Sequence, residues 1–259
     1  MPLGSPQSSP GFVRVKAGVK SGGQSAEVVL TLPVLPVRPS RLLPALRILT
    51  DTAVQAAESA AAERNQTIRC YKGCGACCSQ MVPLRRMEAR RMAVMVDRMP
   101  EPRKSAVLAR FAGARRRFAE AGMLHAVENP HQTDGFDWSE FALRYFHTGV
   151  PCPFLEEGSC SIYAERPMVC REFLVTSDPA HCTHPEQRGV DRLPVPSIGG
   201  AVRKFEREHG PDEDPWVVLI HALDWAAAHP AESGPAVVGA DLLADVIAQF
   251  DEGAAPGKP

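Results

Sequence analysis

The sequence predicts a mainly α-helical protein with little or no sheet, in which a small irregular cysteine-rich domain packs among helices. Apolar residues recur at helical spacing on both sides of the middle of the chain. All eight cysteines lie between residues 70 and 182, and the chain has little periodicity from residue 151 to residue 196. Hydrophobic residues make up 44% of the 259 positions, which is enough to bury a core.

Residues 1–40 are rich in Gly, Pro and Ser, and we expect them to form a disordered lead-in. The apolar run 28–32 is a candidate strand that Pro33 would end. The first expected helix covers residues 41–64, where leucines and alanines fall at helical spacing.

Two further helices are expected over residues 84–99 and 105–124, the first ending before Pro100. Methionines at helical spacing in the first of these favour an adaptable core. Apolar stripes predict three C-terminal helices, at about 197–209, 215–228 and 240–250. The expected organisation is a lead-in (1–40), a cysteine domain with a helical insert (41–196), C-terminal helices packed on it (197–252) and a tail (253–259).

Charge is unevenly distributed although the formal net charge is only −1, which excludes a wholesale basic protein that coats nucleic acid. Residues 85–117 hold 11 Lys and Arg against three acidic residues, and residues 205–259 hold 11 acidic residues against two basic ones. Attraction between these regions, or solvation of both, is the simpler interpretation. An acidic partner for the basic stretch is the alternative, but few aromatic residues there could stack on nucleic-acid bases.

No apolar run is long enough to cross a membrane, and residues 1–26 do not have the pattern of a secretory signal. We therefore expect a cytoplasmic protein with no membrane partner. In a reducing cytoplasm cysteines remain thiols and are available as metal ligands.

The cysteines form a dense run followed by single residues. The run Cys70-Tyr-Lys-Gly-Cys74-Gly-Ala-Cys77-Cys78 brings several thiolates within reach of one site at little entropic cost. The remaining four stand alone, and the complete set of expected ligands is Cys70, Cys74, Cys77, Cys78, Cys152, Cys160, Cys170 and Cys182. Disulfides are disfavoured because no secretion signal supports them.

The metal is less well defined than the ligands. Zinc modules usually present two C-x2-C pairs, and here Cys74 and Cys77 are the one such pair. The C-x3-C-x2-C spacing and the single later cysteines favour an iron–sulfur cluster, with [4Fe-4S] as the expected form and Zn2+ as the alternative. Either would order the irregular stretch 151–196.

Three blocks of sequence resemble the YkgJ-type cysteine-cluster family, whose domain is described as zinc- or iron-chelating. They are the run 70–78, then Cys152-Pro-Phe-Leu155, then Cys160-Ser-Ile-Tyr-Ala-Glu-Arg-Pro-Met-Val-Cys-Arg171. The resemblance covers roughly residues 66–175 and implies a metal domain with a helical insert between the first two blocks. Cys182 and its neighbours His181 and His184 lie beyond the matched part, so their roles as ligands stay open.

The third block also contains Tyr163, Arg166 and Arg171, which are candidates for contact with the cofactor. An arginine near thiolates can offset their charge and donate hydrogen bonds to sulfur. Alternatively, Arg166-Pro167 shapes a turn and Arg171 pairs with an acid.

Two other functions remain open. Some relatives in the resembled family are labelled flagellin lysine N-methylases, which allows a metal-dependent enzyme. Radical S-adenosylmethionine enzymes share the C-x3-C-x2-C spacing, but they have an aromatic residue where this chain has Ala76, and they need strands that the sequence does not predict. A zinc-stapled module that binds protein or nucleic acid is the second alternative.

Overall fold

The structure is a computed structural model that describes residues 7–9, 11–130, 137–184, 186, 189–209, 216–232 and 235–251. Helices make up about 52% of it and the sheets are small and antiparallel, so the mainly helical fold class is confirmed. Among the described helices, none has the length and apolar character needed to cross a membrane.

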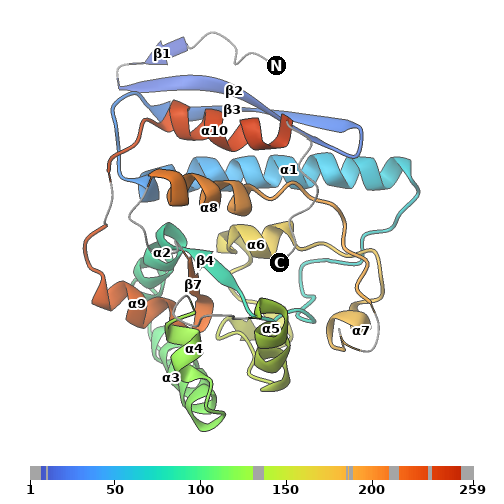
Figure 1. Ribbon diagram of the computed structural model, residues 1–259, viewed down its shortest axis with the longest axis vertical. Helices are drawn as coiled ribbons and strands as arrows, with labels where there is room; N and C mark the ends of the chain where they lie inside the picture. Colours follow the sequence, from blue (N-terminus) through green and yellow to red (C-terminus); the bar gives the residue numbers. More distant parts are fainter. Residues whose placement is uncertain are drawn as a thin grey trace.

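The upper layer of the molecule in Figure 1 is a sheet with three helices beneath it. Strands β1 (Gln7–Ser9), β2 (Phe12–Ser21) and β3 (Gln24–Pro33) pair in that order, all antiparallel. The helices α1 (Leu43–Glu63), α8 (Ile198–His209) and α10 (Gly239–Asp251) lie beneath, with a 3₁₀ turn (Pro39–Leu42) before α1. One face of β2 and β3 is buried with them in a single apolar cluster.

Residues 11–33 therefore differ from the disordered lead-in expected over residues 1–40. Val15, Ala17 and Val19 alternate with exposed residues along β2, and this alternation places them against α1. Gly22 and Gly23 both have positive φ and form the two-residue connection to β3. Glycine and serine in this segment thus serve a hairpin, and the apolar alternation on either side of Gly22 was the signal for it.

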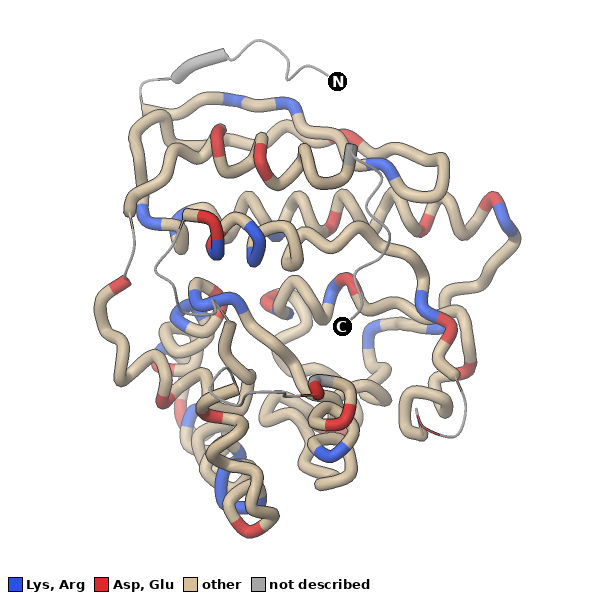
Figure 2. The backbone as a smooth tube through the Cα atoms, in the orientation of Figure 1, with Lys and Arg blue, Asp and Glu red and all other residues tan. Residues whose placement is uncertain are grey.

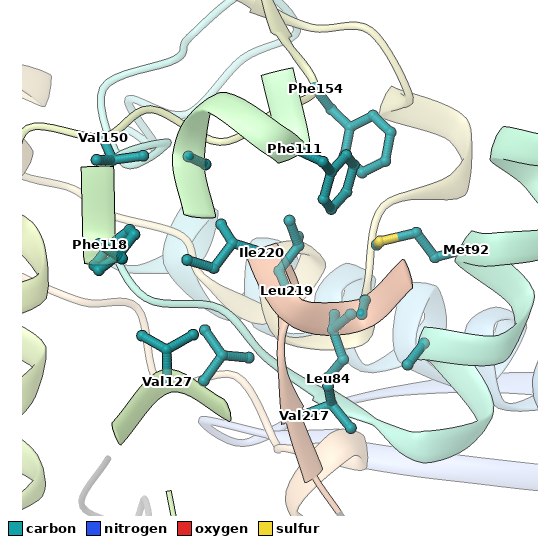
Figure 3. Packing of buried hydrophobic residues seen from close by; sticks show 14 of the residues in the cluster. Leu84, Met92, Phe111, Phe118, Val127, Val150, Phe154, Val217, Leu219 and Ile220 are labelled. Atoms are coloured by element: carbon teal, nitrogen blue, oxygen red, sulfur yellow. The ribbon is translucent and has the colours of Figure 1, made fainter. Parts of the chain in front are cut away.

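The lower half is a second helical group around its own core (Figures 1 and 3). It contains α2 (Arg86–Asp97), α3 (Arg103–Glu120), α4 (Leu124–Glu128), α5 (Trp138–His147) and α9 (Ala222–Ala228). Strands β4 (Pro83–Arg85) and β7 (Trp216–Val218) pair antiparallel through the centre of this group, and Leu84 and Val217 lie side by side in its core. Phe118 and Phe154 are the largest of its fully buried side chains.

The expected helices are found at 43–63, 86–97, 103–120, 198–209 and 239–251, within a few residues of their predicted ends. The expected helix over 215–228 is only partly helical. Residues 216–218 form β7 and residues 219–221 form a 3₁₀ turn before α9. All three residues of β7 are buried. The continuous apolar run over residues 216–220 therefore begins as a strand that is covered on both faces, and it is not the stripe of a single helix.

Many Lys and Arg side chains of the basic stretch 85–117 bond to other groups of this chain. Figure 2 shows Lys and Arg together with acidic residues on these helices. Lys104 Nζ lies 2.7 Å from Asp97 Oδ1. Arg115 pairs with Glu128 at 2.6 Å and also with Asp224 from the acidic C-terminal region. Of these pairs, Arg115–Asp224 joins the basic stretch to the acidic C-terminal region, as the interpretation of mutual attraction expects.

Glu206 on α8 is an exception to this pairing, because its Oε2 is buried without a hydrogen-bond partner in the described structure. Burial raises the pKa of this carboxyl to about 7, which Arg85 and Arg86 only partly oppose. A carboxyl whose folded pKa is raised contributes stability below its unfolded pKa of about 4.3, and this contribution is lost as the pH rises through about 7.

We therefore expect Glu206→Gln to stabilise the protein at pH 8, by about 1–2 kcal/mol, and to have little effect at pH 5. Thermal melts of both proteins at the two pH values measure the difference. Glu208→Gln, an exposed change two residues further along the same helix, is the control and should leave both melts unchanged. Equal effects of Glu206→Gln at pH 5 and pH 8 would contradict this account.

Candidate metal centre

The first cysteine block, residues 70–78, is a chain of tight turns between α1 and β4. Backbone hydrogen bonds close successive turns, from Cys74 N to Tyr71 O and from Cys78 N to Gly75 O, both at 3.0 Å. Gly73 has a φ of 108°, a conformation that a side chain would strain. These turns gather four thiols in nine residues while leaving the block partly accessible, with Tyr71 65% exposed at its tip.

The second and third blocks meet in a short hairpin. Strands β5 (Leu155–Glu156) and β6 (Ser159–Cys160) pair so that Leu155 lies opposite Cys160. Glu157 and Gly158, with φ of 49° and 74°, make the two-residue turn. The hairpin brings Cys152 and Cys160, eight residues apart in sequence, to one place.

The first block is joined directly to this hairpin. Cys152 N donates to Cys78 O at 2.6 Å, across 74 positions of sequence. Gly75 lies so close to the hairpin turn that a Cβ atom on it would stand 2.5 Å from Gly158 O and 2.6 Å from Leu155 Cδ1. Only glycine fits there without displacing the backbone.

Helix α3 of the insert supports the other side of the hairpin. Arg103 Nη2 donates to Ser161 O at 2.7 Å, and Arg110 pairs with Glu156. Phe111 and Phe154 pack edge to face with ring centroids 5.5 Å apart. The helical insert is thus part of the scaffold that places Cys152 and Cys160.

Cys170 lies on α6 (Met168–Glu172), which follows a 3₁₀ turn (Tyr163–Glu165). Arg171 fixes the chain before this helix, because it donates to Arg166 O at 2.9 Å, to Ala164 O and to Asp51 Oδ1 of α1 at 2.7 Å. The hydrogen bonds of Arg171 thus go to oxygen atoms, including an acid, as one of the two sequence interpretations expected. Arg47 of α1 likewise pairs with Glu165.

Cys182 lies on α7 (Pro179–Cys182) and is 3% exposed. Gln80, just after the first block, donates from Nε2 to Cys182 O at 3.5 Å, which places α7 beside that block. The neighbouring histidines have other partners at Nδ1. His181 Nδ1 lies 3.1 Å from Gly189 O, and His184 Nδ1 lies 3.0 Å from Thr183 Oγ1.

Several of the thiols lie close enough to influence one another electrostatically. Burial raises the pKa of Cys152 to about 12, and the nearby Cys160 and Cys77 add to the rise. Burial also raises the pKa of Cys182 to about 11, with further contributions from Cys77, Cys70 and Cys74. Cys77 is the exception, since a hydrogen bond from Cys78 lowers its pKa to about 7. Burial raises the pKa of Cys170, again with Cys152 and Cys77 contributing.

Backbone N–H groups point at several of the sulfur atoms. Val175 N donates to Cys70 Sγ at 3.3 Å, and the backbone N–H groups of Phe154 and Ile162 act to lower the pKa of Cys152 and Cys160 against the larger effect of burial. Each of the last two donors lies two residues after its cysteine. Such bonds stabilise thiolate over thiol, and thiolate is the form that binds metal.

Two buried donors near the cysteines have no hydrogen-bond partner in the described structure. They are Arg166 Nε and Ser161 Oγ, the latter on the residue after Cys160. The Arg166 guanidinium lies over the Tyr163 ring, with its carbon 3.9 Å from the ring centroid. Its charge lowers the pKa of Cys70 and Cys160 against the larger effect of burial, and it adds to the hydrogen bond from Cys78 that lowers the pKa of Cys77. Sulfur atoms of a bound centre are acceptors that would satisfy both donors.

The residues present therefore fit a soft, thiolate-bound metal. All eight cysteines are free thiols, and seven of them are partly accessible. Among the described residues, no three His, Cys, Asp or Glu side chains are already arranged as a set that could hold a metal ion.

Sequence reasoning identified the cysteines but not the contacts that bring them together. The close approach of Gly75 to Gly158, the bond between Cys152 and Cys78, and the support from α3 depend on residues distant in sequence. The dipeptide Glu157-Gly158 between two short apolar segments was a usable signal for the hairpin turn.

The eight free thiols are the residues expected of a cysteine-cluster metal-binding domain. Residues 69–188, just under half of the chain, match the model of the CxxCxxCC family, described as a "Putative zinc- or iron-chelating domain". The match confirms the resemblance seen in the sequence and extends past Cys182. Neither the search of curated proteins nor the search of solved structures finds a match to the chain.

Gly75 offers a direct test of the contact between the first block and the hairpin. We expect Gly75→Ala to lower the free energy of unfolding by about 1–3 kcal/mol, because the new methyl group would collide with Gly158 O. Gly113→Ala is the matched control, since a Cβ there would meet only Arg116 Nη2, at an ordinary contact distance of 3.9 Å, and should stabilise α3 by up to about 1 kcal/mol. Urea denaturation of both variants measures the two effects. Equal stability of Gly75→Ala and the parent would mean that the two segments do not pack as described.

Proposed function

We propose that this protein binds an iron–sulfur cluster, in the [4Fe-4S] form, through its clustered cysteine thiolates, with Zn2+ as the alternative occupant. The observation that supports the proposal is that the first cysteine block packs directly against the hairpin that carries Cys160, through the bond from Cys152 N to Cys78 O, and that all eight cysteines are free thiols. The cluster would supply electron transfer or Lewis-acid chemistry when bound.

The protein's own residues have three tasks in this proposal. The first block would supply four ligands, Cys70, Cys74, Cys77 and Cys78. The hairpin segment would supply Cys152 and Cys160, α6 would supply Cys170, and α7 would supply Cys182. The N–H groups of Val175, Phe154 and Ile162 favour the thiolate form of Cys70, Cys152 and Cys160, against the burial that raises the pKa of all three. Helix α3 holds the hairpin in place, and α6 carries Cys170.

Two features distinguish this donor set from a pair of facing zinc knuckles. One C-x2-C pair is present, and the later cysteines stand singly. Iron–sulfur clusters accept thiolates from scattered loops in this way. Free thiols throughout also support the proposal that the protein works in a reducing compartment such as the cytoplasm.

The test of the proposed cofactor is anaerobic purification followed by metal, sulfide and absorbance measurements. We expect brown protein with broad visible absorbance, iron and acid-labile sulfide in equal amounts, because a cubane contains one sulfide per iron. Cys70→Ala and Cys160→Ala, one from the first block and one from the hairpin, should each lose the colour. Colourless protein with stoichiometric zinc would show that zinc is bound in place of the cluster. Protein free of both metals would contradict the proposal as a whole.

Arg166 and Tyr163 complete the proposal as residues that face the cofactor. Arg166 has a buried Nε without a partner and lies over Tyr163, so its guanidinium is held where it can donate to sulfur. Arg171 acts one step further away, because its donors hold Arg166 O and Ala164 O.

We expect Arg166→Met to weaken cobalt(II) binding to the reduced, metal-free protein by about 10- to 100-fold, through loss of the compensating charge and hydrogen bond. Competition with a chelator measures the affinity. Arg116→Met, an exposed arginine on α3, is the control and should bind cobalt(II) as the parent does. Unchanged affinity in Arg166→Met would show that Arg166 only shapes the turn before Pro167.

A further inference from the structure

Glu88 on α2 is a buried carboxylate that the proposed function does not use. Glu88 is only 3% exposed. Both of its carboxylate oxygens accept hydrogen bonds from backbone N–H groups. Oε2 accepts from Arg85 N at 3.0 Å, which closes the start of its own helix. Oε1 accepts from Met168 N at 2.8 Å, a residue 80 positions later in sequence. One carboxylate thus fixes two distant segments to each other.

Met168 is the first residue of α6, the five-residue helix that carries Cys170. The first N–H groups of a helix have no partner within it. Pro167, which precedes Met168, has no side-chain acceptor, so Glu88 supplies the acceptor from another helix. Cys170 N and Arg171 N both donate to Pro167 O at 3.1 Å. Glu88 therefore holds the first N–H group of the helical turn that sets the position of Cys170.

Water cannot easily replace Glu88 at this place. Met168 is fully buried and packs in the same apolar cluster as Met87, the neighbour of Glu88. Removal of the carboxylate would leave two buried N–H groups without acceptors, those of Arg85 and Met168. The segment that can relieve this by moving is the short helix α6, because α2 retains eleven further residues of helix.

The geometry points to Glu88 as a positioning residue of the metal centre, which sets where Cys170 presents its thiol although it contacts no ligand sulfur itself. This inference rests on the proposed function, since it takes Cys170 as a ligand. It assigns to α2, an element without any cysteine, control over the geometry of the centre.

Cobalt(II) added to the reduced, metal-free protein is a suitable probe, because its sulfur-to-cobalt charge-transfer and d–d bands report the number of thiolates bound. We expect Glu88→Ala to lose one thiolate's share of the charge-transfer intensity and to give the same spectrum as Cys170→Ala. Its affinity for cobalt(II) should fall by about 10- to 100-fold. Glu88→Gln, which keeps one acceptor oxygen, should lie between Glu88→Ala and the parent, and it decides the question if Glu88→Ala does not fold.

Glu232→Ala is the matched control for lost stability alone. Glu232 also joins distant segments, accepting from Ser40 N at 2.9 Å and Ser40 Oγ at 2.6 Å, but no cysteine follows either. This variant should melt earlier than the parent with an unchanged cobalt(II) spectrum. A parent-like spectrum in Glu88→Ala and Glu88→Gln, with a changed one in Cys170→Ala, would overturn the role of Glu88. A parent-like spectrum in Cys170→Ala would instead remove Cys170 from the proposed ligand set.

Discussion

The contact between the first cysteine block and the hairpin 155–160 is the constraint on which the rest of the centre depends. Cys152 N donates to Cys78 O at 2.6 Å, and Gly75 fits against Gly158 with no room for a side chain. The two segments are separated by the whole helical insert, so closing this loop costs conformational entropy. The packed core of the insert, with Phe111 against Phe154, offsets that cost and brings the thiols together.

The two halves of the molecule hold different cysteine-bearing segments. The lower core places the hairpin through α3, and the upper layer, with α1 and α8, holds the segment around α6. Arg171 and Arg47 tie that segment to α1, while Glu88 ties it to α2. The first block is held by its own turns and by its contact with the hairpin.

Much of the fold could be predicted from the sequence because its signals are local. Helical periodicity located α1, α2, α3, α8 and α10, and the cysteine pattern indicated the family whose model matches residues 69–188. The hairpin 12–33 differed from expectation because Gly and Ser were taken as signs of disorder, although alternation along β2 favours a strand. The role of β7 depends on pairing with β4, and that of Glu88 on Met168, both more than 75 residues away. Such partners leave no local pattern.

The central claim is that cysteine sulfur supplies the ligands of a metal bound by this chain. X-ray absorption spectroscopy at the edge of the metal found in the anaerobically purified protein tests it most directly. The account predicts a first coordination shell of sulfur, at about 2.3 Å for zinc, with a second shell of iron neighbours if the cluster is present. A first shell dominated by nitrogen or oxygen would contradict it.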